Sequence, residues 1–166
     1  MKKIILSLAI MASVVNADVF EKGRSSVGIV AGTSYSYGNQ YTIVGVSYDY
    51  YVMDGLSVGA GYRGWFGGDP SINQLTVASS YYIPLSKRFR PYVGAFIRET
   101  FVNHDSAIIG DRNYESYGAR GGIAVTMSPN SYMSFGYAYE EYGSCTKYID
   151  AECSSSYPEL VFSLAF

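Results

Sequence analysis

Residues 157–166 read YPELVFSLAF, and this stretch decides the fold. Its residues alternate in character, and the large apolar set is Leu160, Phe162, Leu164 and Phe166. The residues between them are mostly small or polar. A period of two predicts a β-strand with one apolar face. Because an aromatic edge strand left in water would pair and aggregate, the pattern favours a strand that closes a barrel in lipid.

The same alternation recurs along the chain and predicts seven further strands. The first example is residues 27–35, where Val27 and Ile29 share one face and Gly28 and Val30 share the other. Turn signals such as Asp54-Gly55 separate neighbouring strands. Longer polar loops are expected at residues 103–115 and 143–156. The pattern therefore predicts an all-β fold, an eight-stranded antiparallel up-and-down transmembrane β-barrel over residues 18–166, whose last strand pairs with the first.

Composition agrees with a barrel and excludes some function classes. Charged residues make up 16% of the chain, against about 25% in an ordinary soluble domain. The formal net charge of −2 excludes a strongly basic surface, so we expect no nucleic-acid partner. Beyond the N-terminus there is no apolar run of about 18 residues, so no transmembrane helix is expected there.

The N-terminal residues 1–17 have the pattern of a signal peptide. Lys2 and Lys3 precede a short apolar run over residues 4–15. Val15-Asn16-Ala17 is an acceptable small-residue cleavage site before residue 18. The alternative, a membrane anchor, is disfavoured because the run is too short to span a bilayer comfortably. We expect export of the chain.

Charged residues in the predicted strands fall on the face made of small residues. This lumen charge cluster is Asp49, Arg63, Arg98, Arg120, Glu140 and Glu159. A soluble, lipocalin-like barrel would expose this Gly-, Ser- and Ala-rich face to water, with few lysines, which is a poor soluble exterior. Inside a narrow barrel, three acids would neutralise three arginines. Such a network would be structural, or it would line a narrow ion or small-solute pore.

Aromatic residues gather near the predicted strand ends, as in the two aromatic girdles of membrane barrels. The predicted girdle residues are Tyr35, Tyr37, Tyr41, Trp65, Phe66, Tyr81, Tyr82, Tyr139 and Tyr142. Glu99 interrupts the apolar face, and we expect it near a membrane boundary, where charge costs less.

The segments SVGAGY (residues 57–62) and RPYVGA (residues 90–95), together with the terminal Phe166, resemble small bacterial outer-membrane β-barrels. The OmpA-type transmembrane domain and the OmpX/Ail-type barrels are the families we name. The resemblance implies a monomer in the bacterial outer membrane, in contact with its lipid and lipopolysaccharide. It implies periplasmic chaperones and the barrel assembly machinery as partners, with residues 160, 162, 164 and 166 as the insertion signal. Envelope integrity and loop-mediated binding are the implied roles.

Two features invite a chemical interpretation. Cys145 and Cys153 lie in one predicted loop of an exported chain, which predicts a disulfide worth about 2.5 kcal/mol. His104-Asp105-Ser106 with Glu115 suggests a lipid A-modifying enzyme, in which a His-x-Ser pair lies on a strand near the chain end. Here the tripeptide falls in a mid-chain loop, so we expect no enzyme and no catalytic residues. With a single histidine, we also expect no metal site and no cofactor.

Overall fold

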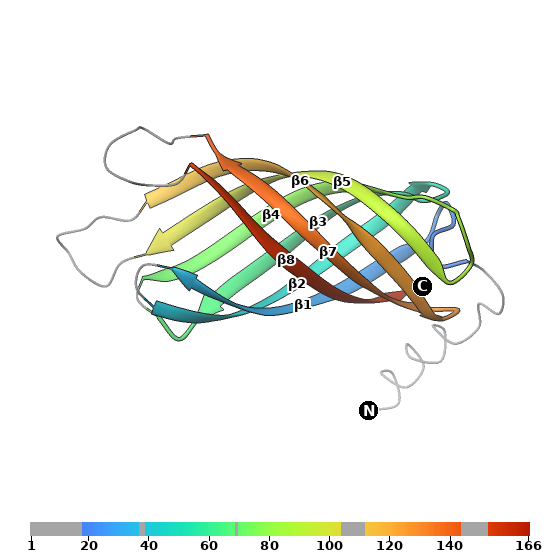
Figure 1. Cartoon of the computed structure of the whole chain (residues 1–166), viewed down its shortest axis with the longest axis horizontal. Helices are drawn as coiled ribbons and strands as arrows, with labels where there is room; N and C mark the ends of the chain where they lie inside the picture. The colour runs from blue at the N-terminus through green and yellow to red at the C-terminus, as the bar shows by residue number, and fades with distance from the viewer. Residues whose placement is uncertain (1–17, 37–38, 69, 104–111, 144–152) are drawn as a thin grey trace, which may run out of the picture.

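The computed structural model describes residues 18–36, 39–68, 70–103, 112–143 and 153–166, which form a closed β-barrel (Figure 1). The eight strands are β1 (Ser25–Ser36), β2 (Asn39–Met53), β3 (Leu56–Phe66), β4 (Ser71–Tyr82), β5 (Phe89–Asn103), β6 (Arg112–Ser128), β7 (Ser131–Tyr142) and β8 (Ser154–Ala165). The predicted fold class and strand number are confirmed. No helix in the described part of the chain is long and apolar enough to cross a membrane.

Every strand runs antiparallel to both of its neighbours, and β8 returns to β1. The short β2–β3, β4–β5 and β6–β7 connections and Phe166 lie at one end of the barrel, which we call the turn end. The opposite end, where β1, β3, β5 and β7 end, is the loop end. In the β2–β3 turn, Gly55 has a φ of 78°, a conformation that glycine adopts without strain.

Side chains alternate between the outside and the inside of the barrel, as the period of two requires. The outward face is apolar: Ile97 is 63% exposed and Tyr137 is 58% exposed. The inward face is built from small and polar residues, which leave room for a few large ones. Gly122 and Gly136 lie opposite each other on β6 and β7, and the Tyr92 ring occupies the space beside Gly136. The barrel therefore has an apolar exterior around an interior of small and polar side chains with a few large rings.

Two sequence predictions need correction. The loops predicted at residues 103–115 and 143–156 are shorter than expected, because β5 continues to Asn103, β6 begins at Arg112 and β8 begins at Ser154. The aromatic girdle prediction was wrong for several residues, because neighbours in a strand point to opposite faces. Phe66 and Tyr81 are exposed on the outside, whereas Tyr41 is completely buried and Tyr82 is 7% exposed within the barrel.

Candidate functional site

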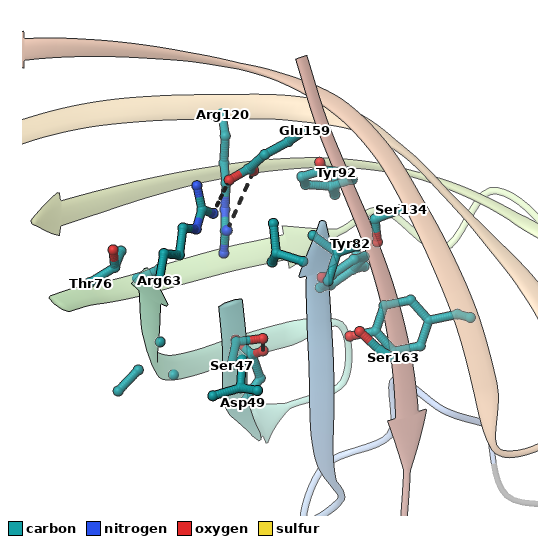
Figure 2. Close-up of a pocket in the computed structure, with 18 residues that line it drawn as sticks. Ser47, Asp49, Arg63, Thr76, Tyr82, Tyr92, Arg120, Ser134, Glu159 and Ser163 are labelled. Carbon is teal, nitrogen blue, oxygen red and sulfur yellow. Dashed lines mark hydrogen bonds and ion pairs between the residues drawn. The ribbon is translucent and has the colours of Figure 1, made fainter. Parts of the chain in front are cut away.

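The barrel interior is the candidate functional site, because the six charged residues predicted to face the lumen all lie there. They come from six different strands and are buried or half-buried: Asp49 on β2, Arg63 on β3, Arg98 on β5, Arg120 on β6, Glu140 on β7 and Glu159 on β8. Figure 2 shows Arg63, Arg120 and Glu159 converging from separate strands, with Asp49 beside Ser47 and apart from them. Strand alternation places each side chain on the inner face, and closure brings the strands together.

Glu159 is the centre of the first group of charges. Arg63 Nη2 donates a hydrogen bond to Glu159 Oε1 across the barrel. Arg120 Nη1 lies 3.8 Å from Glu159 Oε2, so one carboxylate bridges β3 and β6 (Figure 2). The side chain of Glu159 is only 4% exposed. Two arginines around one buried carboxylate supply the opposite charge that such burial requires.

Arg98 and Glu140 form the second group. Arg98 Nη1 lies 2.5 Å from Glu140 Oε2, and the two side chains are 2% and 1% exposed. The Tyr157 hydroxyl donates to Glu140 Oε2 at 3.0 Å, and Ser116 donates to the other carboxylate oxygen. Arg98 Nε donates to Thr76 Oγ1 at 2.9 Å. Each charge is therefore held by an ion pair and by hydrogen bonds from neighbouring strands.

Asp49 is placed differently from the other two acids. Its Oδ2 accepts a hydrogen bond from Ser47 Oγ at 3.4 Å. Within the described residues it has no ion pair at 4 Å or less, although it lines the same cavity as Arg120. This cavity of about 50 Å³ could hold a few waters, since one needs roughly 10–15 Å³. It is too small to form a continuous channel.

The arrangement supports a structural role for the charges more than a chemical one. Three arginines face three carboxylates, so the cluster is formally neutral. The described residues contain no group of three or more His, Cys, Asp or Glu side chains able to hold a metal ion. The ion pairs join strands that are not neighbours, such as β3 to β8 and β5 to β7. They therefore connect parts of the barrel wall that backbone hydrogen bonds do not join directly.

Sequence reasoning missed an aromatic cluster that closes the turn end, which we call the plug. Its rings are Phe20, Tyr51, Tyr82 and Tyr132. The Phe20 ring centroid lies 4.6 Å from that of Tyr82 and 4.9 Å from that of Tyr132. The Tyr51 hydroxyl donates to the Tyr132 hydroxyl at 3.1 Å. All four rings are at most 7% exposed. They fill the barrel between the charge cluster and the turn end.

The plug depends on residues 18–24, which fold across the turn end. Phe20 contributes its ring, and its carbonyl accepts from the Gly55 amide at 2.8 Å. Asp18 forms an ion pair with Arg90, whose guanidinium lies 4.7 Å from the Phe20 ring centroid. These residues precede the first alternating stretch, so the period of two gives no indication of this role. The available signal was Val19-Phe20, an apolar pair that begins one residue after the predicted cleavage site.

The remaining predicted residues lie apart from the charge cluster. The side chains of Leu160, Phe162, Leu164 and Phe166 share the outer face of the last strand, where Leu164 is 52% exposed. Phe166 exchanges two backbone hydrogen bonds with Ser25, which joins the chain end to β1. Residues 1–17 lie outside the described residues, so the signal peptide stays a prediction.

The predicted disulfide and the alternative enzyme site are not tested by the described residues. Cys145 lies outside them, and Cys153 immediately precedes β8, so the pairing stays a prediction. His104, Asp105 and Ser106 also lie outside them, whereas Glu115 is on the outer face of β6.

Three acids occur on the outer surface near the loop end. Glu99 on β5 lies directly opposite Glu115 on β6. On the neighbouring strand, Glu141 accepts hydrogen bonds at 2.9 Å from the hydroxyls of Tyr117 and Tyr139. The charge expected at Glu99 is therefore part of a small acidic patch, which marks one limit of the apolar exterior.

Comparison with known proteins identifies the fold. The chain matches the N-terminal β-barrel domain of Pseudomonas aeruginosa OprF with a TM-score of 0.68 and 16% identity, over 87% of this chain and 98% of that one. It matches Neisserial surface protein A with a TM-score of 0.54 and 18% identity, over 86% and 94%. It matches Ail of Yersinia pestis with a TM-score of 0.54 and 12% identity, over 87% and 99%. No family model and no curated protein sequence matches. The fold is therefore that of small outer-membrane barrels.

Proposed function

We propose that this protein is an integral barrel of the bacterial outer membrane with a structural or surface-interaction role. The observation that carries the proposal is the distribution of charge. Among the strand residues whose side chains are described, the only charged residues on the outside are Glu99, Glu115 and Glu141, all near the loop end. An arginine or lysine on the lipid face would cost about 2–4 kcal/mol near the bilayer midplane.

The orientation follows from the connections. Outer-membrane barrels have short periplasmic turns and longer extracellular loops, so the turn end faces the periplasm. The loop end then faces outward, and the acidic patch lies at the outer boundary of the apolar band. Surface binding would involve the connections between β5 and β6 and between β7 and β8. We propose a monomer in contact with outer-membrane lipid and lipopolysaccharide, without a cofactor.

The plug and the charge cluster favour a structural barrel over the alternative of a narrow pore. Phe20, Tyr51 and Tyr132 are at most 2% exposed, and the cavity between them and the charges is about 50 Å³. An eight-stranded barrel has an interior just wide enough for side chains to fill. Ions would therefore have to displace packed rings. We expect wild-type protein and Arg98→Ala to leave planar bilayers silent; reproducible single-channel steps from wild type would favour the pore.

The direct test of the proposal is the location and heat stability of the protein in cells. Membrane fractionation should place it in the outer membrane. Unheated samples should migrate differently from boiled ones on a denaturing gel, because a closed barrel resists detergent until it is heated. Recovery from the soluble periplasmic fraction would overturn the proposal. A change in lipid A mass caused by the purified protein would instead favour the enzyme alternative.

The C-terminal strand provides a second test. We propose that Leu160, Phe162, Leu164 and Phe166 are read by the barrel assembly machinery, as the resemblance implies. Deleting Phe166 should lower the outer-membrane level of the protein more than it lowers the stability of barrels already folded. Equal levels of the deletion variant and wild type would contradict the role of Phe166 in an insertion signal, but they would not contradict the outer-membrane barrel.

A further inference from the structure

The seam between β1 and β8 is only partly paired. Its register covers five residue pairs and ends at Val30 and Val161, whereas β3 and β4 pair over ten. Both strands continue toward the loop end, β1 to Ser36 and β8 back to Ser154. Figure 1 shows the two ribbons diverging in that direction. Among the described residues, β1 and β8 are therefore paired at the turn end of this seam and unpaired toward the loop end.

Pro158 gives a local reason for the unpaired segment. Ser25 and Phe166 exchange both of their backbone hydrogen bonds, so every second residue of β8 counted back from Phe166 directs its backbone toward β1. Pro158 is one of these residues, and a continued register would place it opposite Thr33. Proline has no N–H to donate, so that ladder bond cannot form.

Small side chains flank the unpaired segment on the outside. At the paired part of the seam, Ile29 lies opposite Phe162. Farther toward the loop end, the outward residues are Ala31 and Thr33 on β1 and Leu160, Pro158 and Ser156 on β8, and all five are exposed. The large apolar side chains that cover the paired part of the seam thus continue only as far as Leu160, and the other four outward residues of the unpaired part are smaller.

A cavity of about 310 Å³ reaches this part of the wall from inside the barrel. Its inner lining includes Ile43, Trp65 and Tyr157, and its lining also includes the outward residues Ala31 and Pro158. Ala31 and Pro158 belong to the unpaired segment, so the cavity borders the part of the wall that ladder hydrogen bonds do not close. The volume lies within the range of about 300–1,000 Å³ of small-molecule pockets.

The lining indicates what kind of molecule fits. Arg63 is already paired with Glu159, and Arg98 with Glu140, so the charged groups of the lining are balanced. Trp65 and the other apolar residues offer a surface for a hydrophobic body. Hydroxyl and amide groups, and the backbone of the unpaired segment, offer hydrogen bonds. Backbone groups facing hydrocarbon are costly unless something satisfies them.

We propose that the unpaired β1–β8 segment is a side entrance through which a small neutral molecule passes from the outer leaflet into this cavity. The molecule has an apolar body and one hydrogen-bonding group, as an aliphatic or aromatic alcohol does. This inference rests on the proposed function, because the entrance needs a surrounding membrane. It assigns a binding site in addition to a structural role.

Trp65 is the only tryptophan of the chain and lines the cavity, so its fluorescence reports arrival of a quencher. The protein is folded into phospholipid vesicles, and trichloroethanol, a neutral quencher that dissolves in bilayers, is added. We expect strong quenching in wild type. Ala31→Phe, which covers the entrance, and Pro158→Val, which supplies the missing ladder bond, should each lower the quenching constant at least twofold. Ala119→Phe places the same ring at an exposed outward alanine on the fully paired β6 and should leave the constant unchanged.

Acrylamide serves as a quencher confined to water, and its quenching constant should be the same in all four proteins. Equal trichloroethanol constants in wild type and both seam variants would overturn the inference, as would absence of quenching in wild type. If one seam variant fails to fold, the other decides. A heat-modifiable gel shift of the same samples reports insertion. Loss of that shift in wild type contradicts the proposed function, whereas a normal shift with unchanged quenching contradicts the side entrance alone.

Discussion

The two ends of the barrel interior are filled in different ways. At the turn end, Phe20, Tyr51, Tyr82 and Tyr132 form the plug, and the β1–β8 seam beside it is paired. Toward the loop end, Arg98, Glu140 and Tyr157 form a polar network beside a cavity of about 310 Å³, where the same seam is unpaired. An apolar cluster of Tyr41, Ile72 and Val102 packs at the loop end between β2, β4 and β5.

The difference shows how an eight-stranded barrel can combine a rigid part with an accessible one. Hydrophobic burial is non-directional and excludes water, so the packed rings close the turn end. Charged groups require partners at fixed distances, and the space around such pairs cannot be filled as evenly. Regions with fewer packed apolar contacts open more readily, so we expect local opening at the loop end of the seam. The predictions below run from the largest expected effect to the smallest.

Removing Glu140 should have the largest effect on stability. Glu140→Leu leaves the Arg98 guanidinium buried without its carboxylate, and loss of one partner of a buried pair costs about 3–5 kcal/mol. Urea unfolding in vesicles measures the free energy of unfolding. The double variant Arg98→Met with Glu140→Leu should recover most of that loss. Glu141→Leu is the matched control, because the neighbouring side chain points outward; equal losses for Glu140→Leu and Glu141→Leu would contradict the buried network.

Truncating the plug should have the next largest effect. Phe20→Ala removes a ring that is 1% exposed, and we expect a loss of about 3 kcal/mol by the same measurement. Phe89→Ala is the control of the same residue type at the turn end, where the ring is 53% exposed, and it should cost less than half as much. If Phe20→Ala unfolds at the wild-type urea concentration, residues 18–24 do not close the barrel.

Restoring the missing ladder bond should have a smaller, stabilising effect. Pro158→Val supplies an N–H opposite Thr33, and a net hydrogen bond contributes about 1 kcal/mol. Hydrogen exchange should then show a protected amide at position 158. Pro129→Val, in the β6–β7 turn, removes a proline without offering a ladder bond and should not give this gain. Rapid exchange at position 158 would mean that the seam stays apart for another reason.

The acidic patch should give the smallest effect. Glu115→Gln removes one of two like charges that lie directly opposite each other, so we expect stabilisation by a few tenths of a kcal/mol at low salt. The gain should shrink at high ionic strength, because salt screens exposed charges. Glu141→Gln should instead weaken the hydrogen bonds from Tyr117 and Tyr139. A gain from Glu115→Gln that is independent of salt would rule out charge repulsion as its cause.

Much of the fold could be predicted because the period of two is local. The alternation in residues 157–166 was enough to predict the apolar outer face of the last strand, and similar alternation elsewhere gave eight strands. Glu159 and Arg63 could be assigned to the inner face in the same way. Their pairing could not, because it depends on how far each strand is shifted along its neighbour. The plug was missed since Phe20 precedes the first strand and belongs to no alternating pattern.

The aromatic residues show the same limit. Tyr81 and Tyr82 are identical in character, and their position near a strand end suggested one interface role for both. Alternation sends Tyr81 outward and Tyr82 into the plug. The composition of the segment does not distinguish the two tyrosines. The position of each residue in the alternation of the strand decides which face its side chain is on.

The sequence by itself determined the barrel: the number of strands, their inner and outer faces, and the sorting of Asp49, Arg98 and the other charges to the inside. These properties depend on residues two positions apart in one strand. Only the tertiary structure decided that Glu159 bridges Arg63 and Arg120, that Phe20 closes the turn end, and that pairing of β1 with β8 stops at Val30. These depend on closure, which brings the first and last strands together with a stagger that no single strand specifies.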